Sequence, residues 1–144
     1  MRICDLITSP DPAIRNQSLE SWTRNASAAA LLTACSELDA FRRTCPNLYE
    51  RVRALFFLYA IHRFHLPEKL AFTGHSNARG LIPFGGYEQL LHRRFAEAIE
   101  SFLAVQAKEG PSDGISSALA SAYYRLAMQT LADQVRRSVR TVRG

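Results

Sequence analysis

The sequence predicts an all-α fold of five to six antiparallel helices around a buried central helix at about residues 47–65. Two observations lead to this prediction. Apolar residues recur every three or four positions through most of the chain, which is the period of an amphipathic helix. Residues 54–61 are apolar at eight consecutive positions, and such a helix must be covered on most sides.

The central helix has recognisable ends. Asn47 and Glu50 form an N-cap pair, in which each side chain can bond a free backbone N–H. Basic residues lie near the carboxyl end of this helix, where positive charge interacts favourably with the helix dipole, and Pro67 limits further continuation of the helix. Because a bilayer requires about 18–20 apolar residues, the apolar run is too short to cross one.

The sequence that precedes the central helix predicts two helices. Asp11 is the expected N-cap and Pro12 the first residue of a helix that runs towards Leu19. Trp22 is expected to dock on the core. A second helix opens at 25–27 and runs to about Arg43. Its apolar stripe consists of Ala28, Leu31, Leu32, Cys35, Leu38 and Phe41. The tight connection at 44–46 predicts an antiparallel hairpin with the central helix.

The following part is less regular. A short helix or turn at 68–72 leads into an irregular loop at 73–86, which contains four glycines. The sequence of residues 87–108 predicts one helix. The last segment, 115–143, has two apolar stripes separated by the five-residue step from Leu126 to Leu131. Two helices with a turn near 127–129, or one long helix that changes partners, would explain this step.

Length and composition fit one folded helical domain of 144 residues, either a whole protein or part of a longer one. The N-terminus lacks the pattern of a secretory signal, so we expect a cytoplasmic protein. Cys35 and Cys45 lie beside apolar residues at helical spacing, which predicts buried, reduced thiols.

Positive charge is concentrated at one end of the chain. The net charge is +5, and four of the 18 basic residues are Arg136, Arg137, Arg140 and Arg143. Helical spacing places these arginines on a basic face, with Val135, Val139 and Val142 opposite. Such a helix can bind phosphates, an acidic partner or an anionic membrane surface, or can be a solvated terminal face. The valine stripe must be covered by this domain or by a neighbour.

The glycine-rich loop is a second candidate site. Glycines allow backbone N–H groups to approach an oxyanion, and nearby side chains could add donors. The candidate anion-binding residues are His75, Ser76, Asn77 and Arg79. The alternative is a structural loop that covers helix ends.

The histidines do not complete a metal site in the sequence. His62 and His65 could share a helix face, but no residue of a suitable type completes a ligand set. We expect them to cap carbonyl groups or rest on the surface. The sequence predicts no catalytic residues, no cofactor and no metal.

The C-terminal third resembles a tetratricopeptide repeat. Residues 95–113 look like a second helix with its exit turn, and residues 118–139 look like the following unit. Ala98 and Ala132 are 34 residues apart, which is the period of that family, and aromatic residues occupy its large positions. These aromatics are Phe95, Phe102 and Tyr123. The resemblance implies a repeat-like helical pair that binds another protein.

Two further segments, 47–67 and 130–144, are similar to parts of long bacterial proteins described as glucose-phosphate uridylyltransferase-like or sugar-kinase-like. This resemblance implies a helical part of a larger protein.

Three functions follow from the sequence. The first is a non-catalytic helical packing or protein-interaction module that binds a protein partner or neighbouring domain through the C-terminal helices. The second is a weak binder of nucleic acid or another anionic partner through the terminal arginines. The third is a helical accessory region of a larger enzyme acting on sugar phosphates or nucleotides, with the glycine-rich loop as an anion site.

Overall fold

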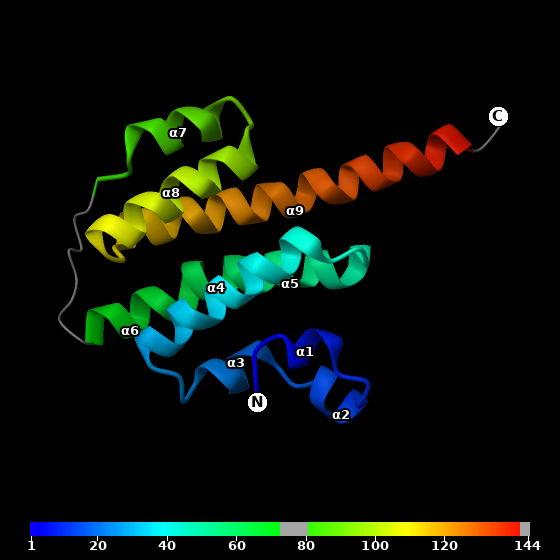
Figure 1. The fold of residues 1–144 in the computed structure, drawn as a ribbon, viewed down its shortest axis with the longest axis horizontal. Helices are drawn as coiled ribbons and strands as arrows, with labels where there is room; N and C mark the ends of the chain where they lie inside the picture. The colour runs from blue at the N-terminus through cyan, green and yellow to red at the C-terminus, as the bar shows by residue number, and fades with distance from the viewer. Residues whose placement is uncertain (73–80, 142–144) are drawn as a thin grey trace.

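The computed structural model describes residues 1–72 and 81–141. These residues form helices and their connections, with no strand among them, which confirms the all-α class. Figure 1 shows the short N-terminal helices against one side of α4 and α5, and α7 to α9 on the other side.

Helix α5 (Leu48–Ala60) is the buried centre, as predicted. Helices α4 (Ala28–Thr44) and α9 (Asp113–Thr141) both pack against it. Its residues Ala54, Leu55 and Leu58 are fully buried. The predicted cap is present, because Asn47 Oδ1 accepts the Glu50 N–H at 3.0 Å.

The helix does not stop near Pro67. A π-helical segment (Ile61–His65) follows α5, and α6 (Leu66–Phe72) continues from it. The Leu66 N–H bonds the Ile61 carbonyl in the wide π pattern. In a regular α-helix the proline ring would clash with the carbonyl four residues earlier, and the wide turn lies just where that clash would occur. The expectation that Pro67 limits continuation was therefore wrong.

The N-terminal segment contains three short helices, α1 (Asp5–Thr8), α2 (Pro12–Arg15) and α3 (Leu19–Thr23). Asp11 caps α2 as predicted, with its carboxylate 2.9 Å from the Ala13 N–H. The predicted extent of that helix was wrong, because Ser18 caps a new helix by accepting the Ser21 N–H. Trp22 packs on the core as expected.

The helix predicted over 87–108 is two helices, α7 (Phe84–Leu91) and α8 (Phe95–Glu109). Arg93 adopts the left-handed conformation, with φ 61°. The Arg93 N–H bonds the Leu90 carbonyl and the Arg94 N–H bonds the Gln89 carbonyl. This is the Schellman pattern, which usually has glycine at the position occupied here by Arg93.

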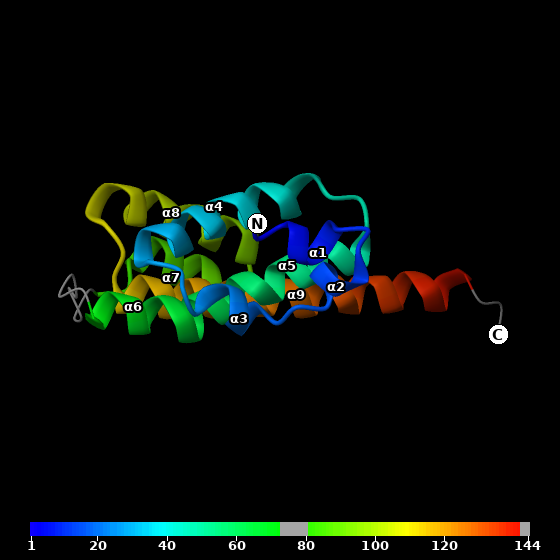
Figure 2. The ribbon, with the colours of Figure 1, turned by 90° about the horizontal axis from the view of Figure 1, so that it is seen from below.

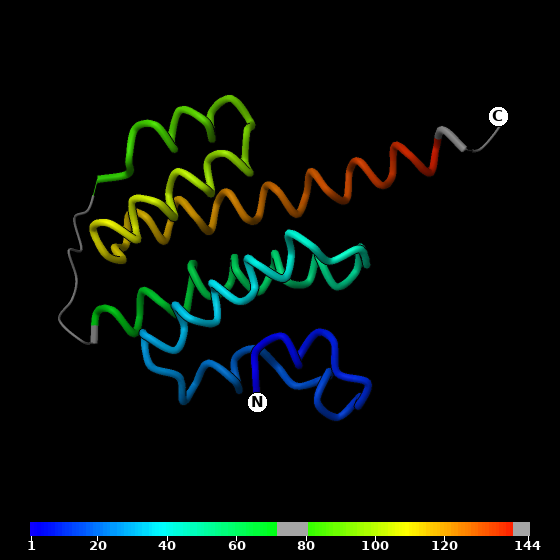
Figure 3. The backbone as a smooth tube through the Cα atoms, in the orientation of Figure 1, coloured from blue at the N-terminus to red at the C-terminus, as the bar shows by residue number. Residues whose placement is uncertain are grey.

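Helix α9 is one continuous helix (Figure 3), and the five-residue step from Leu126 to Leu131 separates a stripe that packs on other helices from a stripe that is exposed. Ser112 begins it by accepting the Ile115 N–H. Its first half packs against α5 and α8, and its carboxyl end extends beyond the other helices (Figure 2). Within the described residues, no helix is both long enough and apolar enough to cross a membrane.

A histidine lies within the core. His62 is fully buried in the π-helical segment and stacks on Tyr123, with ring centroids 5.9 Å apart. Neither ring nitrogen has a hydrogen-bond partner among the described residues. Burial lowers the pKa of His62 to about 4, against the opposing effect of the Asp39 carboxylate. The expectation that His62 caps carbonyls or rests on the surface was wrong.

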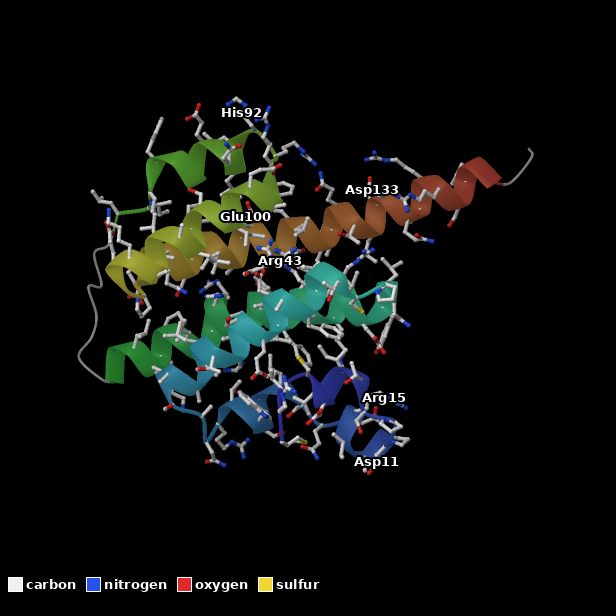
Figure 4. The ribbon with its side chains drawn as sticks, viewed as in Figure 1. Asp11, Arg15, Arg43, His92, Glu100 and Asp133 are labelled. Carbon is white, nitrogen blue, oxygen red and sulfur yellow. The ribbon has the colours of Figure 1, made fainter. Side chains whose placement is uncertain are left out.

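Asp39 connects three helices. Its carboxylate accepts hydrogen bonds from Tyr123 Oη at 3.0 Å, Arg42 Nε at 2.8 Å and Arg43 Nε at 2.9 Å. Arg43 also pairs with Glu100 of α8 at 3.1 Å, and Figure 4 shows these two side chains between the helices. Burial raises the pKa of Asp39, but the Arg42 charge and the three hydrogen bonds together lower it below its usual value.

The cysteine prediction is confirmed, since Cys35 and Cys45 are buried and free. Burial, with a smaller effect of Asp39, raises the pKa of the Cys35 thiol to about 12. Cys35 therefore stays protonated and unreactive in the folded protein.

Two neighbouring glycines of α7 provide a test of packing. A Cβ at Gly86 would lie 2.6 Å from Phe102 Cδ1, whereas a Cβ at Gly85 would come no closer than 3.9 Å to Ser101 Oγ. We expect Gly86→Ala to lower the free energy of unfolding by about 1–3 kcal/mol through overpacking. Gly85→Ala should leave it unchanged or raise it by about 0.5 kcal/mol. Urea unfolding followed by circular dichroism measures both, and equal effects would contradict the packing of α7 on α8.

The buried His62 predicts acid sensitivity. Its pKa is lowered in the folded state, so the unfolded chain binds the proton more readily, and stability falls as pH decreases from about 6.5 towards 4. Between about pH 7.5 and pH 5, His62 should account for a loss of about 2 kcal/mol. Urea unfolding at both pH values measures this loss, and the free energy of unfolding of His62→Leu should fall less than that of the unsubstituted protein, by that amount. The control is His92→Leu, which changes an exposed histidine; an unchanged pH dependence in His62→Leu would refute the prediction.

Candidate functional site

The residues of the predicted anion loop lie outside the described part of the chain. His75, Ser76, Asn77 and Arg79 all belong to residues 73–80, so the loop remains a prediction.

The predicted basic face is partly described. Arg136 is exposed, and its Nη1 lies 3.5 Å from Asp133 Oδ1, which is also exposed. Arg137 lines a groove with residues of α4 and α5. Arg140 lies in the last turn of α9, and Arg143 is outside the described residues. Of Arg136 and Arg137, whose side chains the structure describes, only Arg137 lies beside other helices.

The predicted valine stripe is uncovered. Leu131, Val135 and Val139 are 37%, 62% and 67% exposed, respectively. They are four residues apart and share one side of the helix. The stripe runs into the carboxyl end of α9, which extends beyond the other helices in Figure 1; Val139 lies two residues before Thr141, where that helix ends. Val142 is outside the described residues.

The stripe continues towards the body of the protein. Met128 and Tyr124 precede Leu131 at helical spacing, and each is 41% exposed. The Tyr124 ring lies 5.2 Å from that of Tyr59 and 6.2 Å from that of Phe56. The apolar surface of α9 thus begins against α5 and emerges into solvent further along the helix.

The charge around the exposed stripe is strongly positive. From Leu126 to the last residue, Asp133 is the one acidic residue in the sequence, against four arginines. Its pair with Arg136 joins two exposed side chains, and such pairs stabilise proteins little. Arg136 lies about 100° around the helix from Val135, so a partner at this end of α9 meets an apolar stripe with a basic flank, and not with arginines opposite it as predicted (Asp133 is labelled in Figure 4).

A groove of about 500 Å³ lies on another side of α9, between that helix, α4 and α5. Its walls include four arginines, three leucines and one carboxylate. These are Arg42, Arg43, Arg51, Arg137, Leu48, Leu55, Leu126 and Asp133. Sequence reasoning identified only Arg137 of the four arginines, because the others belong to two helices far away in the chain.

A larger cavity of about 660 Å³ lies near α3 and α6. His65 lines it, with Nδ1 3.3 Å from Thr23 Oγ1, and burial lowers the pKa of His65 against the effects of Glu20 and Glu68. Lys69 also lines it and donates to the Arg24 carbonyl. The charged groups are of both signs, so the cavity favours no particular ligand.

The His62–His65 pair does not form a ligand set, since His62 lies in the core and His65 contacts Thr23. No group of three histidine, cysteine, aspartate or glutamate residues could hold a metal ion in the part of the chain that the structure describes.

Comparison with protein-family models, curated proteins and solved structures finds no match to this chain. The resemblances to tetratricopeptide repeats and to the uridylyltransferase-like or sugar-kinase-like proteins therefore stay predictions.

Proposed function

We propose that this protein is a non-catalytic helical interaction module, and that the projecting end of α9 binds an amphipathic helix with acidic flanks. The observation that carries the proposal is the exposed stripe of Leu131, Val135 and Val139, on a side of α9 that no other described helix covers. Burying a valine side chain is worth about 1.5 kcal/mol or more, so covering this stripe is favourable.

The form of the stripe supports a helical partner. Its residues follow spacings of three and four from Tyr124 to Val139, close to the repeat along which two helices pack. A helix with apolar residues at similar spacing can lie along it and extend the packing that α5 provides at Tyr124.

Charge favours an acidic partner over a second copy of this chain. Two copies paired along this segment would bring together two sets of four arginines with one aspartate each. Carboxylates beside the partner's apolar stripe would instead pair with guanidinium groups. The partner helix can belong to a separate protein or to a neighbouring domain.

Nucleic-acid binding through the same arginines is less well supported. Exposed valines and leucine contribute nothing to phosphate contacts, and the segment 126–144 contains no aromatic residue for stacking on bases.

A synthetic peptide pair can test this proposal. One peptide has leucine at its contact positions and glutamate on its flanks, and the other has lysine in place of glutamate. We expect the protein to bind the acidic peptide, and Val135→Gln/Val139→Gln to weaken binding at least about tenfold, because apolar contact is lost. Fluorescence anisotropy measures both affinities.

The matched control is Leu91→Gln, which removes an apolar side chain of the same 62% exposure from α7. It should leave peptide binding unchanged. Equal binding of the two peptides, or equal effects of the α7 and α9 variants, would contradict the proposal. A dimer in sedimentation experiments that is lost in Val135→Gln/Val139→Gln would identify a second copy as the occupant and would also contradict it.

A further inference from the structure

We infer that the groove between α4, α5 and α9 is a binding site for a small phosphate monoester. Arg42, Arg43, Arg51 and Arg137 line it from three helices. Nothing in the sequence places these four guanidinium groups together, and the fold alone brings them to one groove.

The groove has hydrogen-bonding capacity that the described residues do not use. Arg42 lines it with a side chain that is only 10% exposed, and its Nη2 is buried without a partner. Arg51 Nε is likewise buried without a partner. A buried charged donor without an acceptor is costly, so a small side-chain shift that brought these two donors to the oxygen atoms of a ligand would remove that cost.

The charges in the groove also favour an anion. Arg42 and Arg43 share the carboxylate of Asp39, and Arg43 also pairs with Glu100, so these two arginines are already compensated. Arg51 and Arg137 form no ion pair with any described residue, and Asp133 is the one carboxylate lining the groove. The groove therefore has an excess of positive charge, carried by Arg51 and Arg137, that favours an anion.

The types of residue indicate the class of ligand. Arginine bonds phosphate oxygens in a planar, two-pronged geometry, and a phosphate monoester carries about −1.5 to −2 charge with three acceptor oxygens. Leu48, Leu55 and Leu126 supply apolar contacts for the organic part of the molecule. The volume of about 500 Å³ suits a small ligand.

This site is separate from the exposed stripe on α9. Leu126, Thr130 and Arg137 line the groove, whereas Leu131, Val135 and Val139 lie on another side of the helix. Failure of phosphate binding would therefore leave the proposed protein interaction untouched, and the reverse also holds.

Phenyl phosphate is a suitable probe, with benzoate as a singly charged control, in calorimetric titrations at constant ionic strength. We expect saturable binding of phenyl phosphate and weaker binding of benzoate. Arg51→Gln and Arg137→Gln should each weaken the phosphate affinity about tenfold, the usual effect of losing a charge-assisted hydrogen bond. Both variants spare the Asp39 cluster, and thermal unfolding will show that they fold.

Matched variants separate the site from the overall charge. Arg125→Gln removes the same charge from α9 outside the groove and should leave the affinity unchanged. Asp133→Asn should strengthen binding, whereas Glu109→Gln, with the same change in net charge, should not. The absence of saturable binding, or equal losses in Arg125→Gln and Arg137→Gln, would overturn the inference. Tighter binding of a phosphoserine peptide than of phenyl phosphate would overturn the assignment to a small molecule.

Discussion

The bonds to Asp39 hold the helices of this protein in register. A single carboxylate of α4 accepts from Tyr123 of α9 and from two arginines of its own helix, one of which also reaches Glu100 of α8. Tyr123 in turn covers the buried His62. The arrangement satisfies the buried polar atoms of Asp39 and Tyr123 and holds Arg42 and Arg43 at the groove wall.

Much of the fold could be predicted from the sequence because its signals are local. Apolar periodicity located α4, and the caps at Asp11 and Asn47 act within three residues of each helix start. The division between α7 and α8 was missed because Arg93 occupies the left-handed position where glycine is the usual signal. The passage through Pro67 was missed because the π turn leaves no mark in apolar spacing.

The candidate sites were predictable to different degrees. Helical spacing located the stripe at Val135 and Val139 together with Arg136 and Arg137, because these residues lie within one helix. The groove depends on Arg42, Arg51 and Arg137, which only tertiary packing brings together. The burial of His62 also depends on packing, since the same residue type at a helix end usually remains in contact with water.

The π-helical segment has a consequence for changes in chain length. A π turn accommodates one more residue than an α turn, so deleting one residue within Ile61–His65 would allow a regular helix. Because five residues of a π turn carry the chain about as far around the axis as four residues of an α turn, every residue that follows would keep its side of the helix. Leu66 and Leu70, which are buried, would still face the core. The π-helical segment thus allows the chain to lose one residue there without changing which side of α6 packs on the core.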